Sequence, residues 1–299
     1  MSDIELTPDG SVKRSSSHSA FLRIVRFYEY GPYYLISALA CGFVAKFPVN
    51  SSIIPVLVFV AASSIFGFVI NDIADAELDR KAGKLRNPIA SDDLSISAAW
   101  KLALVFLGVA ILSLYPLDLL GKSLGIIVIT LFSGYSFGLR AKVRPGVDVV
   151  CHASWNALYG VMAYSLYRPL DFIGVGLSGL LFLSSMLVEL LNEIRDHDSE
   201  KDMIRTTATA IGKRGALKMC ILILFLALSL FVDLIIIGGL PWILLIFSPS
   251  IIVLVKPIMN ALRSEQKEQN LLPTLVSRGA AIVILIFITY LIIKVLGFG

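Results

Sequence analysis

The feature that most constrains this chain is a series of apolar stretches, each roughly 20 residues long, which recurs along nearly its whole length. Such a stretch crosses the hydrocarbon core of a bilayer as one α-helix. A hydrophobic fraction of 57% also lies above the range of soluble domains. The stretches lie at about residues 30–47, 53–71, 97–116, 119–138, 147–166, 170–191, 216–237, 240–258 and 275–296.

The apolar stretches predict helices and not barrel strands. Within lipid, only helices and closed barrels pair all of their backbone polar groups internally. The stretches lack the alternation of polar and apolar residues that marks a barrel strand. The sequence therefore predicts an all-α, polytopic membrane protein with a bundle of nine transmembrane helices. The stretch 147–166 is the weakest of the nine because His152 and Asn156 interrupt it.

The first 20 residues differ from the rest of the chain. Residues 1–20 are polar and rich in serine, without the apolar core of a signal peptide. Such a segment buries too little apolar surface to offset the entropy lost on ordering, so we expect a disordered N-terminal tail. Residues 21–299 are expected to form a single transmembrane domain.

The positive charges fall almost entirely on one side of the predicted membrane. Nine spans place the N-terminus and every even-numbered loop on the same side. All of the 26 lysines and arginines lie there except Lys46, Lys122, Arg168 and Lys294. Because positive residues accumulate on the cytoplasmic side of membrane proteins, we expect the N-terminus and these loops to be cytoplasmic.

Two acidic motifs occupy equivalent positions, at the ends of the second and sixth predicted spans. The first consists of Asn71, Asp75 and Asp79. The second has the same order and spacing, an asparagine, an aspartate and a third acid at intervals of four, and lies 121 residues further along. Its residues are Asn192, Asp196 and Glu200. The constant offset indicates two four-helix repeats, each carrying one motif.

The composition of the motifs favours a magnesium site. Residues four apart share one face of a helix, and like charges at that spacing repel unless a cation lies between them. Carboxylate and amide oxygens without His or Cys suit Mg²⁺, which proteins hold together with substrate phosphates. Asp72 and Asp198 are further candidate ligands or neighbours of ligands. The alternative is that these are solvated acids paired with nearby Lys and Arg, but the motif occurs twice in register.

Basic residues follow both motifs and fill the loop after the fourth span. Arginine and lysine donate hydrogen bonds to phosphate oxygens, and a diphosphate bridged by Mg²⁺ would still need such donors. The candidate donors are Arg80, Arg86, Arg140, Lys142 and Lys201. No glycine-rich nucleotide-binding motif occurs in the chain, which disfavours nucleotide chemistry, and no nucleic-acid partner is expected.

The first motif, with Asp72 and the tripeptide Arg-Asn-Pro at 86–88, resembles the first signature of the UbiA superfamily of intramembrane prenyltransferases. The second motif resembles the second signature, with Glu200 where the family more often has Asp, and the likeness covers about residues 20–296. The resemblance implies a helical bundle whose central cavity opens to lipid. It implies that the motifs bind Mg²⁺ and an isoprenoid diphosphate donor. The prenyl group would pass to a lipophilic acceptor: a quinone precursor, an aromatic compound, an ether lipid or a carotenoid.

Two further residues, Tyr135 and Glu189, are candidates for substrate contacts. Tyr135 and Arg140 resemble the family's loop motif of a tyrosine and a basic residue. Glu189 lies within the sixth span, one turn before the second motif, at a depth where an ionised carboxylate is costly. Two readings of Glu189 stay open. It orients the acceptor or accepts a proton, or it pairs with His152 or Asn156 for structural reasons.

Aromatic side chains in the spans are candidates for a cavity wall. An allylic cation that forms as the diphosphate leaves must be kept from water, and aromatic faces stabilise a cation. The candidates are Trp155, Tyr159 and Phe182, with packing or contact with lipid as the alternative.

Three other functions remain open from the sequence. The same scaffold would serve as a terpene cyclase if the cation were quenched internally, without an acceptor. A transporter with an acidic cation site is disfavoured, because such sites lie near the membrane midplane whereas both motifs lie at span ends. In a non-catalytic membrane protein, the acids would form only an interaction surface.

Overall fold

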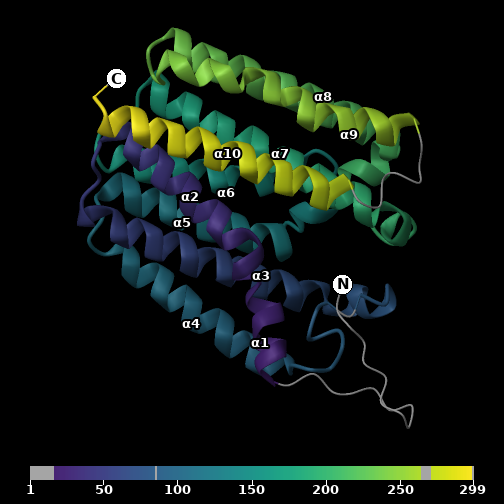
Figure 1. The fold of residues 1–299 in the computed structure, drawn as a ribbon. Coiled ribbons are helices and arrows are strands. Elements are labelled where there is room, and N and C mark those ends of the chain that lie inside the picture. Colours follow the sequence, from purple (N-terminus) through teal and green to yellow (C-terminus); the bar gives the residue numbers. More distant parts are fainter. Residues whose placement is uncertain (1–16, 85, 264–270, 298–299) are drawn as a thin grey trace.

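The computed structural model describes residues 17–84, 86–263 and 271–297, and this part of the chain is all-helical (Figure 1). The α-helices are α1 (Ser17–Val25), α2 (Phe27–Ala45), α3 (Ile54–Lys81), α4 (Ile96–Leu114), α5 (Leu119–Ser136), α6 (Val147–Ser165), α7 (Phe172–Glu200), α8 (Thr207–Ile236), α9 (Ile251–Arg263) and α10 (Leu271–Val295). The 3₁₀ segments are η1 (Ser51–Ile53), η2 (Ala141–Val143) and η3 (Trp242–Ser250). The predicted all-α class is confirmed.

Each of the nine predicted spans overlaps a helical segment of the described chain, and that at 240–258 is divided between η3 and α9. Among the described residues, seven helices are long and apolar enough to cross a membrane. The two predicted spans outside that set are α2, whose apolar part Gly31–Ala45 is shorter, and α6. The apolar stretches of the sequence and the long apolar helices of the structure both indicate a multi-pass membrane bundle.

Helix α6 carries polar residues among apolar ones, and it lies inside the bundle. It packs against α2, α5 and α7, and Trp155, Tyr159 and Tyr164 on it are buried. Helix α4, at the bottom of the bundle in Figure 1, instead exposes apolar side chains such as Leu104 and Leu112. A helix that other helices shield from lipid can carry polar groups that would be costly on a lipid-facing helix.

Helices α6 and α7 face each other through polar pairs that recur every four residues along both helices. Glu189 Oε2 lies 3.4 Å from His152 Nε2, and one turn deeper Asn156 Nδ2 donates to Ser185 Oγ at 2.9 Å. One turn in the other direction, Asp148 and Glu193 accept the amides of consecutive residues of α8. We call the pairs Asp148/Glu193, His152/Glu189 and Asn156/Ser185 the polar ladder.

Both acidic motifs are helical. Helices α3 and α7 continue past the predicted apolar stretches as far as Lys81 and Glu200, so the motifs lie on their last turns. The next helices begin at side-chain caps: Ser95 for α4 and Thr206 for α8. The predicted stripe of acids along one helix face is therefore available in both repeats.

The predicted N-terminal tail lies mostly outside the described residues, which begin at residue 17. The predicted boundary at residue 20 falls inside α1. Ala20 and Ile24, one turn apart, are both buried, and α1 packs against α3. This apolar spacing explains why the helix begins before the predicted boundary.

The packing of α3 against α5 is tight at Gly67. A Cβ atom added there would lie 2.3 Å from the ring of Phe132, whereas one added at Gly108 on α4 would meet no atom within 4 Å. Gly67→Ala should therefore destabilise the protein by about 1–3 kcal/mol through overpacking. Gly108→Ala, the matched control, should be neutral or stabilising because alanine favours the helix. Thermal unfolding in detergent measures both, and equal midpoints would contradict the packing described.

Candidate active site

The ends of α3 and α7 border a cavity of about 590 Å³. Both acidic motifs line this cavity, although 121 residues separate them in sequence. The motif residues that line it are Asn71, Asp75, Asp79, Asn192, Asp196 and Glu200. Among the predicted substrate contacts, the cavity also brings together Arg86, Tyr135, Lys142 and Glu189.

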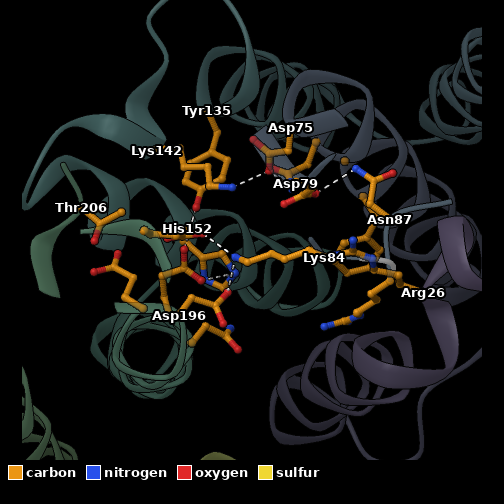
Figure 2. Close-up of a pocket in the computed structure, with 18 of the residues that line it drawn as sticks. Arg26, Asp75, Asp79, Lys84, Asn87, Tyr135, Lys142, His152, Asp196 and Thr206 are labelled. Atoms are coloured by element: carbon orange, nitrogen blue, oxygen red, sulfur yellow. Dashed lines mark hydrogen bonds and ion pairs between the residues drawn. The ribbon is translucent and has the colours of Figure 1, made fainter. Parts of the chain in front are cut away.

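The carboxylates of the first motif are held by neighbouring side chains. Asn71 Nδ2 donates to Asp75 Oδ2 at 3.0 Å, and the Lys142 ammonium pairs with the same carboxylate (Figure 2). Asp79 Oδ2 accepts a hydrogen bond from Asn87 Nδ2 at 2.9 Å. Lys142 belongs to η2, so the connection between α5 and α6 closes onto the end of α3.

The second motif is held by a lysine from the other repeat. Lys84 Nζ lies 3.1 Å from Asp196 Oδ2 and 2.6 Å from Glu200 Oε1. Figure 2 shows its side chain extended across the site toward Asp196. Arg195 Nε donates to the other oxygen of Asp196 at 2.7 Å. Because Lys84 follows α3 in the chain, it links the end of one acidic helix to the acids of the other.

Both lysines stay charged across the physiological range. Burial acts to lower the pKa of the Lys84 ammonium, but Asp196 and Glu200 outweigh it and raise that pKa above its ordinary value. The pKa of Lys142 is raised in the same way, chiefly by Asp75 against the effect of burial. Stability from these ion pairs is therefore fully present below the ordinary lysine pKa of about 10.4 and is lost only as the pH rises through the higher folded-state values.

The asparagine of each motif holds a buried amide oxygen without a partner. Asn71 Oδ1 and Asn192 Oδ1 accept no hydrogen bond from any described residue. A buried polar atom without a partner is costly unless a ligand satisfies it. Each of these oxygens belongs to a motif with two carboxylates, and this all-oxygen donor set fits Mg²⁺. Within the described residues, no three His, Cys, Asp or Glu side chains form a complete metal cage, and Mg²⁺ is commonly held partly by substrate phosphates.

Aromatic residues line another part of the cavity. Phe132 and Trp155 stack with ring centroids 4.5 Å apart, and Tyr135 meets Trp155 edge-on at 5.5 Å. Tyr34 and Phe68 complete this lining. The site therefore combines a charged region at the helix ends with an apolar, aromatic wall.

Two of the three aromatic candidates from the sequence lie outside the cavity lining. Tyr159 is fully buried, and its hydroxyl lies 2.7 Å from Ser63 Oγ. Phe182 is not among the lining residues either. Trp155 is thus the candidate that the structure places at the cavity.

Glu189 faces the cavity and has two polar partners. Tyr135 donates its hydroxyl to Glu189 Oε1 at 2.6 Å, and His152 Nε2 lies 3.4 Å from Glu189 Oε2. His152 Nδ1 is buried without a partner among the described residues. Of the partners considered from the sequence, His152 and not Asn156 pairs with this carboxylate. The cluster therefore places a carboxylate, a phenol and an imidazole together at the cavity.

The start of α8 is anchored beside the site by two buried carboxyl groups. Thr207 N donates to Asp148 Oδ2 at 2.6 Å, and Ala208 N donates to Glu193 Oε2 at 2.7 Å. Carboxylates satisfy the free amides and favourable dipole at a helix N-terminus. The neighbouring cap residue Thr206 lines the cavity, so these carboxyl groups fix one of its walls.

Asp72 is placed behind the cavity. Its side chain is fully buried and pairs with Arg26, which lines the cavity at the junction of α1 and α2. Asp72 itself is not among the lining residues. Its position suits holding Arg26 and does not suit direct contact with a substrate.

Four predicted contact residues lie outside the cavity lining. Arg80 donates to Asp92 at 2.9 Å and to a loop carbonyl, and Arg140 is exposed. Asp198 faces away and pairs with Lys213 at 2.8 Å. Lys201 is exposed after the end of α7. The sequence shows which basic residues lie near the motifs along the chain. The direction in which each side chain points decides which of them reach the cavity.

Several lining residues are not among those that the sequence motifs point to: Arg26, Tyr34, Phe68, Lys84, Phe132 and Glu193. A partial signal existed for some of them. Lys84 follows the first motif closely, and Glu193 lies inside the second. Arg26 carried no such signal, because only the tertiary fold brings the junction before α2 to α3.

The sequence profile of the UbiA prenyltransferase family matches residues 34–277 of the chain. The chain belongs to this family. The resemblance drawn from the two motifs is thereby confirmed, and the matched region contains both of them together with the cavity residues from Tyr34 to Thr206.

Two curated relatives of this UbiA family chain match about half of it. It is 27% identical over 164 residues to digeranylgeranylglyceryl phosphate synthase from Sulfolobus acidocaldarius, covering 54% of this chain and 58% of that protein. It is 26% identical over 176 residues to coumarin 8-geranyltransferase 1, chloroplastic, from Citrus limon, covering 53% of this chain and 42% of that protein. The chain therefore spans about half the length of the curated relatives it matches.

Solved structures share the fold over nearly the whole chain. A UbiA homolog from Archaeoglobus fulgidus bound to GPP and Mg²⁺ matches with a TM-score of 0.71 and 19% identity, covering 90% of this chain and 96% of that one. A UbiA homolog from Aeropyrum pernix K1 matches with a TM-score of 0.66 and 17% identity, covering 95% and 100%. Likeness at this level of identity establishes the fold.

Asn87 joins the loop after α3 to the first motif and provides a stability test. Its Nδ2 donates to Asp79 Oδ2 and to the carbonyl of Asp72, and its Oδ1 accepts the amide of Ile89. Asn87→Ala should cost about 1–3 kcal/mol because buried groups lose their partners. Asp92→Asn in the same loop, which breaks only an exposed ion pair, should cost less than about 0.5 kcal/mol. Thermal unfolding compares the two, and an unchanged midpoint in Asn87→Ala would contradict this role.

Proposed function

We propose that the protein transfers a prenyl group from an isoprenoid diphosphate to a lipophilic acceptor within the membrane, in a Mg²⁺-dependent reaction. The observation that carries the proposal is the meeting of both acidic motifs at one cavity that also has an aromatic wall. Family membership supports it, as does the Archaeoglobus fulgidus homolog of the same fold, solved with GPP and Mg²⁺.

The diphosphate would bind among the helix ends. Asn71, Asp75 and Asp79 would hold one Mg²⁺, and the matching residues of α7 would hold a second. The bound metal would supply positive charge that stabilises the diphosphate as the carbon–oxygen bond breaks. Arg86 and Lys142 line the same cavity and would donate hydrogen bonds to the phosphate oxygens.

The prenyl chain would lie along the aromatic wall. Bond cleavage leaves an allylic cation that water would quench, so its surroundings must be apolar. Trp155 and Phe132, stacked at 4.5 Å, and Tyr135 offer aromatic faces on this side. Ring faces attract a nearby cation and exclude water at the same time.

The acceptor would approach Glu189. An acceptor that forms a bond to the prenyl carbon must lose a proton, and Glu189 is a carboxylate positioned by Tyr135 and His152 at the cavity. By their names, the two curated relatives differ in acceptor, one making a glyceryl phosphate lipid and the other a geranylated coumarin. The proposal therefore names the acceptor only as lipophilic.

The active-site end of the bundle would face the cytoplasm. The excess of Lys and Arg on the side of the N-terminus and the even-numbered loops supports this orientation. Both acidic motifs lie at helix ends on that side.

The role of the two motifs is tested with the purified protein, radiolabelled geranylgeranyl diphosphate, membrane lipid extract and Mg²⁺. Asp75→Asn and Asp196→Asn should each lower the initial rate of transfer by about 10²–10³-fold, because each removes charge that stabilises the leaving diphosphate. Chelation of Mg²⁺ should abolish transfer by the unmodified protein.

Matched controls come from the same helix ends. Glu77 lies between the acids of α3 but faces solvent, and Asp202 lies just beyond α7 and is exposed. The control variants are Glu77→Gln and Asp202→Asn. Both should retain transfer. Motif variants as active as these controls would refute the two-motif mechanism. Labelled cyclic hydrocarbon formed without extract would point to a cyclase.

Glu189 is tested separately from donor binding. Glu189→Gln keeps the shape of the side chain but cannot accept a proton, so transfer should fall by about 10²–10⁴-fold. Affinity for the donor, measured by isothermal titration calorimetry with a non-reactive thiodiphosphate analogue, should stay within about threefold, since Glu189 is placed on the acceptor side. A normal rate of transfer in this variant would assign Glu189 a structural role only.

A further inference from the structure

Lys84 forms ion pairs with Asp196 and Glu200, the two acids of the second motif that would bind the proposed metal. Its ammonium lies 2.6 Å from Glu200 Oε1 and 3.1 Å from Asp196 Oδ2, and it bridges the two acids of the second motif. Arg195 also contacts Asp196, as its neighbour on α7. Lys84 thus spans both carboxylates of the second motif.

An ammonium and a divalent metal compete for this position. Both are attracted to the same carboxylate oxygens, and two cations a few ångströms apart in a partly buried site repel strongly. Lys84 and Asp196 are each about a quarter exposed, and Glu200 is buried, so solvent screens the competition only in part. A metal can occupy the second motif only when the ammonium leaves it.

The Lys84 ammonium would lose its ion pairs on leaving the second motif, unless another anion replaced them. Its chain is flexible, and the ammonium donates three hydrogen bonds in any direction. The loop that carries it joins α3 to α4, and Asn87 ties this loop to the first motif. A diphosphate lying between the two motifs would offer new acceptors within reach of the same side chain.

We propose that Lys84 is a resident counter-ion that keeps divalent metal off the second motif until a diphosphate arrives, and that its ammonium then moves to the phosphate oxygens. This inference rests on the proposed function, because it concerns the same site. It makes metal and diphosphate load together, so the site does not trap free metal ions.

Direct measurement of metal binding tests this counter-ion role. Mn²⁺, which is visible by electron paramagnetic resonance, is titrated into the purified full-length protein with and without inorganic pyrophosphate. Without pyrophosphate, Lys84→Gln should bind Mn²⁺ about ten- to hundredfold more tightly than the unmodified protein, because a competing positive charge is removed. With pyrophosphate, the advantage should disappear, because Lys84 then helps to hold the anion.

Two variants separate this role from a general effect on folding. Lys84→Arg keeps the charge and should bind Mn²⁺ alone as weakly as the unmodified protein. Lys81→Gln removes a lysine that pairs with Glu77 at 2.7 Å on the exposed side of α3, and it should also match the unmodified protein. Equal affinity of Lys84→Gln and the unmodified protein for Mn²⁺ alone overturns the counter-ion role, whatever the transferase activity. If no variant binds Mn²⁺ even with pyrophosphate, the proposed function itself fails.

Discussion

A carboxylate that lies against lipid without a partner is costly, and this constraint explains where the acids of the site lie. Every acidic side chain that lines the cavity lies on α3 or α7, and apolar side chains of helices such as α4 form the surface that lipid would contact. Helix α6 carries its polar residues at the centre of the bundle, where α2, α5 and α7 cover it. The bundle is thus arranged around polar groups that must be kept from the bilayer.

The same constraint explains how the cavity keeps its charges together. Lys84 and Lys142 come from connections outside the spans, and each pairs with a motif carboxylate at a helix end. Tyr135 and His152 do the same for Glu189 at greater depth. Partners supplied by other segments thus hold these acids in place, and under the proposed function a diphosphate would take over some of these contacts.

The fold and the position of the site could be predicted from the sequence. The length of each apolar stretch and the four-residue spacing of the acids are properties of single helices, which do not depend on contacts between distant segments. All six motif residues reach one cavity. The basic residues were harder to assign: Arg80 and Arg140 lie outside the cavity lining, whereas Lys84 and Arg26 belong to it. Which side chain turns inward depends on loop conformation and on contacts between segments far apart in sequence, as between Arg26 and Asp72, and neither is encoded in local spacing.

The polar ladder has a consequence for how the bundle assembles in the membrane. Its pairs hold α6 against α7 in one register, and further along Gly160 lies so close to Leu181 that an added Cβ would be 2.7 Å from it. Sliding α7 by one turn in one direction would set Glu189 against Asp148 and leave Asn156 facing Leu181. The contacts between these two helices therefore specify the register in which the hairpin packs. An inserting chain that joins α6 to α7 correctly has also set the depth of the second motif.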